Sequence, residues 1–197
     1  RRLVRQAGER LKAAGVASPE HDARELAEWI LGTQLPLVDG ADEAFAATYE
    51  EAVQRRTARE PLQRITGRMF FRGLELECRP GVFIVRPETE VVAGVAIEAV
   101  LARVAGGVAG GPLVVDLCTG SGAIAAAVAA EVPAARVIAV ELADEACAAA
   151  VDTCEWHAPG RVRVVQADAA APSTLAGLDG SVDVVVTNPP YVPAGAL

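Results

Sequence analysis

The sequence has 197 residues, 52% of them hydrophobic, which suits one large domain or a small domain joined to a larger one. It contains no apolar run of about 18 residues that would span a membrane, and its N-terminus lacks the pattern of a signal peptide. The net charge of -8 is uneven: residues 1–86 carry 14 basic and 13 acidic side chains, and residues 87–197 carry 4 and 13. We expect a cytoplasmic protein with no membrane partner, and the acidic half argues against nucleic acid binding across it.

The cysteines form no CxxC pair and no regular framework, and the sequence has only two histidines to join them. No metal site is therefore predicted, and reduced thiols fit best. The side chains considered are Cys78, Cys118, Cys147, Cys154, His21 and His157.

Residues 1–61 are predicted to form a small helical domain without catalytic chemistry of its own. In one helix Ser18 is placed as N-cap, Pro19 as first helical residue and Gly32 as the stop. A second helix is expected over 42–59. Apolar residues at helical spacing should share one face of the first of these helices, namely Ala23, Leu26, Ala27, Ile30 and Leu31.

Residues 62–87 are predicted to be a linker β-hairpin, with turns at Gly73 and at Pro80–Gly81 and with Phe70 and Phe71 in its core. A helix follows in "RPETEVVAGVAIEAVLARVA". From Pro112, strand-like and helical segments alternate: "LVVDL", "AIAAAVAAEV", "RVIAVEL", "ADEACAAAVDTCEW", "RVRVVQAD" and "SVDVVVTN". The alternation predicts an α/β domain over 88–197, with a parallel sheet and helices on both faces.

A glycine loop, "DLCTGSG", joins the first of these strands to its helix, and acidic residues end three strands in succession. Gly120 and Gly122 would let the backbone approach a nucleotide-like ligand, although such a loop also serves as a plain turn. Asp116 would repel a pyrophosphate, which favours a cationic cofactor such as S-adenosylmethionine over a dinucleotide. Glu141 is placed to accept from ribose hydroxyls and Asp168 from an adenine amino group, while each acid alone also suits a loop or helix cap.

The stretch "NPPY" ends the fourth strand and suits methyl transfer to a planar nitrogen. The lone pair of such a nitrogen is delocalised, so a site must hold its N–H groups with acceptors. Asn188 supplies a side-chain carbonyl, Pro189 a backbone carbonyl, and Pro190 adds no competing N–H. Tyr191 offers a flat surface against which the planar group can pack.

These motifs, with "EPLQRITGRMFFRGLELECRPGVFIVRPETE", resemble those of the peptide chain release factor N(5)-glutamine methyltransferases over nearly all of the chain. The resemblance implies a helical domain and a hairpin ahead of a Rossmann-like methyltransferase domain. It implies direct methyl transfer from S-adenosylmethionine to the glutamine of the Gly-Gly-Gln motif in release factors, by a monomer. It places Asn188, Pro189, Pro190 and Tyr191 around the substrate. It places the cofactor on Cys118, Thr119, Gly120, Ser121, Gly122, Glu141, Asp168 and Ala169, in addition to Asp116 and Asn188.

The sequence departs from the family pattern at Cys118, where many relatives have glycine, and at Val85, where many have proline. It also ends six residues after Tyr191, whereas such domains continue for several strands, so a C-terminally truncated domain is expected. Arg86, Glu88 and Glu90 either have a functional role or simply start the next helix.

Three other functions remain open. The closest is a nucleic acid amino methyltransferase acting on adenine N6 or guanine N2, because the same acceptors suit an exocyclic amine. The others are a nicotinamide dehydrogenase, which shares part of the glycine pattern, and a non-catalytic binding relative.

Overall fold

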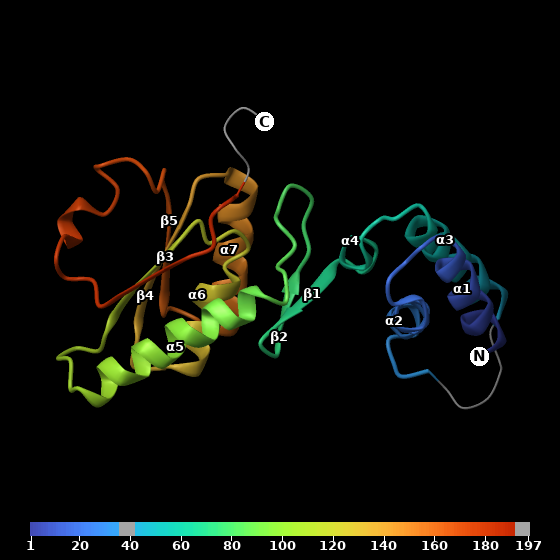
Figure 1. Cartoon of the computed structure of the whole chain (residues 1–197), viewed down its shortest axis with the longest axis horizontal. Helices are drawn as coiled ribbons and strands as arrows, with labels where there is room; N and C mark the ends of the chain where they lie inside the picture. The colour runs from blue at the N-terminus through green and yellow to red at the C-terminus, as the bar shows by residue number, and fades with distance from the viewer. Residues whose placement is uncertain (36–41, 192–197) are drawn as a thin grey trace. The chain divides into compact units, whose positions relative to one another are not determined.

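The computed structural model describes residues 1–35 and 42–191, and the chain divides into two compact units, Arg1–Arg68 and Met69–Leu197 (Figure 1). Helix α4 (Leu62–Thr66) lies within the segment for which the sequence predicts the linker hairpin. The proposed domain limits at residues 61 and 87 stay predictions. Across the described residues no helix is both long enough and apolar enough to cross a membrane.

The first unit is helical, with α1 (Arg2–Ala13), α2 (Pro19–Leu31) and α3 (Glu43–Thr57) ahead of α4. Ser18 and Gly32 bound α2 as predicted, and Gly32 has φ +65°, a conformation that glycine adopts without steric cost. The Ser18 side chain makes no capping hydrogen bond. Asp42 does cap α3, because its carboxylate accepts from the Phe45 N–H at 2.8 Å.

The core of this unit confirms most of the predicted apolar face of α2. Ala23, Leu26 and Ala27 are fully buried, and Ile30 packs against them from a half-buried position. Leu31, the last residue of α2, is 38% exposed, so the core covers the end of this face only in part. Tyr49 of α3 crosses the core to donate to the Ala23 carbonyl at 2.7 Å, so α2 and α3 are held by a hydrogen bond as well as by burial.

The predicted hairpin consists of β1 (Arg68–Phe71) and β2 (Leu74–Glu77). Its loop has positive φ at both positions, +47° at Arg72 and +79° at Gly73, as tight hairpin turns require. Phe71 is buried, but Phe70 is 58% exposed, so its predicted place in the hairpin core is wrong. After the turn at Pro80–Gly81 no further strand forms, and the chain leads into α5 (Thr89–Ala105).

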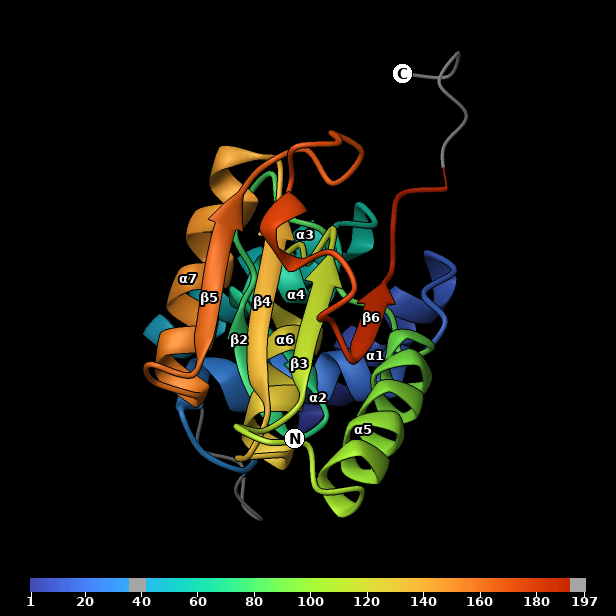
Figure 2. The same ribbon diagram turned by 90° about the vertical axis from the view of Figure 1, so that its left-hand side faces the viewer.

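The second unit contains a four-stranded sheet whose strands all run parallel, as predicted (Figure 2). Its order is β5-β4-β3-β6. The strands are β3 (Leu113–Leu117), β4 (Arg136–Glu141), β5 (Val162–Gln166) and β6 (Val184–Thr187), and the connecting helices are α6 (Ala123–Glu131) and α7 (Asp144–His157).

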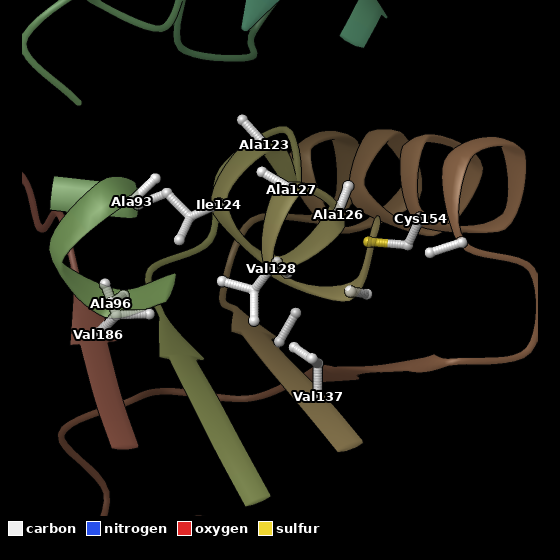
Figure 3. Close-up of a cluster of buried hydrophobic side chains, with 14 of the residues drawn as sticks. Ala93, Ala96, Ala123, Ile124, Ala126, Ala127, Val128, Val137, Cys154 and Val186 are labelled. Atoms are coloured by element: carbon white, nitrogen blue, oxygen red, sulfur yellow. The ribbon is translucent and has the colours of Figure 1, made fainter. Parts of the chain in front are cut away.

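Helices cover one face of this sheet, where α5, α6 and α7 bury alanine and valine side chains against β3, β4 and β6 (Figure 3). Across residues 69–191 the other face is covered by the segment 167–182, including the short helix η1 (Ala176–Leu178). The sequence predicts helices on both faces, but over the described residues the second face carries only this short 3-10 helix and no α-helix. The chain crosses the sheet in one direction from β3 to β4 to β5, and in the other direction from β5 to β6. Because such connections are right-handed, the segment between β5 and β6 passes over the opposite face of the sheet.

Candidate active site

All four parallel strands end at one edge of the sheet, its carboxyl edge (Figure 2). The predicted site residues lie in the last two positions of a strand or in the segments that follow β3, β5 and β6. From β3 the chain leads to β4 on one side, whereas β6 pairs with β3 on the other. This is the topological switch point at which open α/β sheets bind ligands. Leu117 pairs with Thr187, so Cys118 and Asn188 leave neighbouring strands at matched positions.

The glycine loop is held in left-handed conformations, with φ +60° at Gly120 and +80° at Gly122. A Cβ on Gly122 would lie 2.9 Å from the Ala150 Cα, because α7 packs closely against the start of α6. A Cβ on Gly120 would meet no atom within 4 Å. The two glycines therefore have different reasons to lack a side chain: Gly122 serves packing, and Gly120 leaves its surroundings open to a ligand.

Cys118 also adopts a left-handed conformation, with φ +59°, which explains why glycine suits this position. Burial and the nearby Glu141 carboxylate raise the pKa of the Cys118 thiol, so nothing here activates this cysteine as a nucleophile.

Asp116 lies beneath the loop rather than at its surface, with none of its area exposed. Its Oδ2 accepts from the Thr119 hydroxyl at 2.5 Å and from the Ala125 N–H at 3.1 Å. Burial raises the pKa of Asp116 to about 7. Its Oδ1 and the Ser121 hydroxyl are buried polar atoms without a partner among the described residues.

Glu141 is the last residue of β4, as predicted, and Asp168 lies two residues after the end of β5. One Glu141 oxygen accepts from the Gly120 N–H at 2.8 Å, and the other accepts from the N–H groups of Leu142 and Ala143. Glu141 thus ties the glycine loop to β4. Asp168 is exposed and accepts from the Ala170 N–H at 2.8 Å, and the neighbouring Ala169 packs against the sheet.

Asn188 is half-buried beside the glycine loop, and its amide is held at both ends. Its Nδ2 donates to the Thr89 hydroxyl at 3.2 Å, and its Oδ1 accepts from the Tyr191 hydroxyl at 2.9 Å. Pro189 is half-buried, whereas Pro190 and Tyr191 are exposed, with 82% of Tyr191 accessible. The motif thus lies beside the glycine loop with an aromatic ring at its open side.

The sequence patterns do not point to Thr89, the fourth residue of "RPETE". Arg86, Glu88 and Glu90 were weighed instead, because their charges are conspicuous. Glu90 accepts from the Arg72 N–H in the hairpin turn at 2.9 Å, and Arg86 lies 5.7 Å from the Phe83 ring centre. No sequence pattern places residue 89 beside residue 188, since only the packing of α5 against β6 brings them together. Over the described ranges no group of acids, cysteines and histidines is arranged to hold a metal ion.

Two family models match the chain: the PrmC N-terminal domain at residues 2–67 and a methyltransferase domain at residues 114–194. A release factor glutamine methyltransferase of Streptomyces coelicolor is 52% identical over 96% of this chain and 65% of its own length. One of Mycolicibacterium smegmatis is 45% identical over 100% of the chain and 67% of its own length.

A third relative carries a different name. A 4-amino-L-phenylalanine/4-methylamino-L-phenylalanine methyltransferase of Streptomyces pristinaespiralis is 46% identical over 73% of this chain and 47% of its own length. The chain spans about two thirds of the length of the first two relatives. The two matched segments coincide with the helical unit and with the parallel sheet of this chain. The chain belongs to the family of release factor glutamine methyltransferases.

Proposed function

We propose that the protein methylates the side-chain amide nitrogen of a release factor glutamine, that of its Gly-Gly-Gln motif, with S-adenosylmethionine as methyl donor. One observation carries this proposal: Asn188 leaves β6 beside the glycine loop that leaves β3, since Leu117 and Thr187 are partners in the sheet. Adjacent strands lie about 5 Å apart, so an amide held at Asn188 and a cofactor held by the loop are neighbours.

The residues present fit this cofactor. The backbone at Gly120 is open, Glu141 and Asp168 offer carboxylate acceptors, and the Ser121 hydroxyl and Asp116 Oδ1 are unpartnered among the residues described. An acid-rich edge suits a ligand with positive charge better than one with phosphates. When bound, S-adenosylmethionine supplies a methyl carbon activated by its sulfonium. We propose contact with the cofactor from the loop 118–122 and from Glu141, Asp168, Ala169 and Asn188, with Asp116 acting from beneath the loop.

Asn188 and Pro189 act on the acceptor nitrogen. Their carbonyl oxygens take the two N–H bonds of the substrate amide, which turns its lone pair toward the methyl group and favours the positive charge that grows on nitrogen. Methyl transfer would form the N–C bond as the donor's C–S bond breaks, and the amide nitrogen would then return to neutrality by loss of a proton to solvent. Pro190 adds no donor of its own, and the proline pair fixes the carbonyls before reaction.

The test uses the full-length protein with release factor and labelled S-adenosylmethionine. Asn188→Ala is expected to lower turnover by at least about a hundredfold, as loss of an aimed polar group does elsewhere, with cofactor affinity within about tenfold of wild type. Asn188 is the only asparagine of the sequence, so the control removes another side-chain amide, the exposed Gln54, by Gln54→Ala. Normal turnover in Asn188→Ala would overturn the role given to this residue.

A second candidate substrate is an aromatic amine, favoured by the relative named for 4-amino-L-phenylalanine. An aryl amine also has a flat NH₂ group with a delocalised lone pair, so the same acceptors suit it. The release factor relatives match more of this chain, which favours glutamine. The assay therefore includes 4-aminophenylalanine and adenine-containing DNA, and label in either of these but not in the release factor would refute the glutamine reaction.

A further inference from the structure

The Asn188 side chain reaches a partner 99 residues away in the sequence. Its Nδ2 donates to the Thr89 Oγ1 at 3.2 Å, and Thr89 is only 5% exposed. The Tyr191 hydroxyl approaches the other end of the amide, but Tyr191 is 82% exposed. The buried contact to Thr89 is thus the one that the fold itself holds.

An asparagine side chain has two orientations that differ in which atom faces a substrate. Rotation of the amide by 180° exchanges the oxygen, which accepts a hydrogen bond, with the NH₂ group, which donates. Only the oxygen can accept from a substrate N–H, since an NH₂ group facing a substrate NH₂ brings donor against donor. A partner that accepts from Nδ2 therefore favours the orientation of the amide in which the Asn188 oxygen is left to accept from the substrate.

Thr89 is well suited to be this partner, because its own position is fixed from several sides. It is the first residue of α5, and its N–H donates to the Arg86 carbonyl at 3.0 Å. The next residue, Glu90, accepts from the Arg72 N–H in the hairpin turn. Ala93, one turn further on, is fully buried against the sheet. The hydroxyl is thus presented by a helix end that packing and hydrogen bonds both hold.

We propose that Thr89 is a positioning residue: its hydroxyl holds the Asn188 amide with its oxygen turned to the substrate nitrogen. The inference rests on the proposed function and deepens it, by giving the "RPETE" segment a task at the methyl-transfer site. Thr89 touches neither substrate nor cofactor in this role and acts only through Asn188.

The test compares Thr89→Val and Thr89→Ser in the full-length protein. Valine keeps the shape and removes the hydroxyl, so kcat for release factor methylation should fall about 10-fold to 100-fold, as expected when a buried donor loses its partner. The KM for S-adenosylmethionine should stay within about threefold of wild type, because the glycine loop is untouched. Serine keeps the hydroxyl and should restore most of kcat.

Thr57→Val serves as the matched control, because it removes a threonine hydroxyl that bonds to the Val53 carbonyl within α3. A purely structural role for Thr89 would lower the unfolding midpoint without a selective loss of kcat, and this result would overturn the proposal. So would a Thr89→Ser variant as slow as Thr89→Val.

A double variant separates this inference from the proposed function. If Thr89 acts through Asn188, adding Thr89→Val to Asn188→Ala should lower turnover no further, whereas independent effects would multiply. Normal turnover in Asn188→Ala alone would show that Asn188 is not the acceptor for the substrate N–H, and would contradict the proposed function. Loss of turnover in Asn188→Ala with a normal Thr89→Val would refute the inference and leave the proposed function intact.

Discussion

Asp116 illustrates how a buried carboxyl group under the glycine loop links stability to pH. Burial raises its pKa to about 7, with the Glu141 charge adding to the rise, while hydrogen bonds from Thr119 and Ala125 oppose it. The folded pKa lies above that of the unfolded chain. The group therefore contributes its full stability below about pH 4, and this contribution is lost as the pH rises through 7.

We expect Asp116→Asn to match wild type near pH 4 and to be more stable at pH 8. The asparagine oxygen can still accept from Thr119 and Ala125, but the side chain never becomes charged. The full difference corresponds to about 4 kcal/mol, which is one pKa difference of about three units converted to free energy. Urea unfolding of both proteins between pH 4 and pH 8.5 measures this difference, and parallel pH curves would contradict this account of Asp116.

At the scale of the elements, the two glycines of the loop have different roles, although the sequence presents them as one motif. Gly122 allows close helix packing, and Gly120 leaves the backbone open. Gly122→Ala is expected to destabilise the fold by about 2–4 kcal/mol, because a left-handed alanine is strained and its Cβ would overlap the backbone of α7. Gly120→Ala meets open space, so only the conformational cost of about 1 kcal/mol applies.

Cofactor binding should show the reverse order. If the loop holds the cofactor as proposed, a Cβ on Gly120 would stand against it, so calorimetry should find S-adenosylmethionine affinity reduced by about tenfold or more, or at least 1.4 kcal/mol. Folded Gly122→Ala should bind nearly as wild type does. Unchanged affinity in Gly120→Ala would mean that no ligand lies against this part of the backbone.

The elements differ in how far the sequence predicts them. The "LVVDL" segment forms β3 at the predicted residues, because a continuous apolar run between turn residues suits a strand buried on both faces. The "GVFIV" segment has a similar composition but forms no strand, since Val82 packs against α7 and Phe83 is exposed. Local pattern cannot distinguish these cases, because the difference lies in which neighbours are available.

The candidate site shows the same division. Glu141 ends one parallel strand, and Asp168 and Asn188 follow the ends of two others, so the sequence could place them at one edge. The burial of Asp116 and the contact between Thr89 and Asn188 depend on how α5 and α6 pack, and no spacing in the sequence encodes that.

At the scale of the whole molecule, the N-terminal unit has a core of its own, built around Leu11, Leu26 and Val53. A nearly buried ion pair joins two of its helices, with Arg56 Nε 2.7 Å from Asp22 Oδ2. The side chains are only 15% and 7% exposed. Removal of one partner from such a pair leaves a charge in a place that water hardly reaches.

We therefore expect a fragment of residues 1–68 to unfold cooperatively, and Arg56→Ala to lower its free energy of unfolding by about 3 kcal/mol. The control is Arg24→Ala, which breaks the pair between Arg24 and Glu28 on the helix surface, where solvent screens the charges and a much smaller effect is expected. Trp29, which packs against the core, is the only tryptophan of this fragment and reports its unfolding by fluorescence. Equal losses in the two variants would mean that the Asp22 carboxylate reaches water once Arg56 is gone, so that burial does not set the strength of this pair.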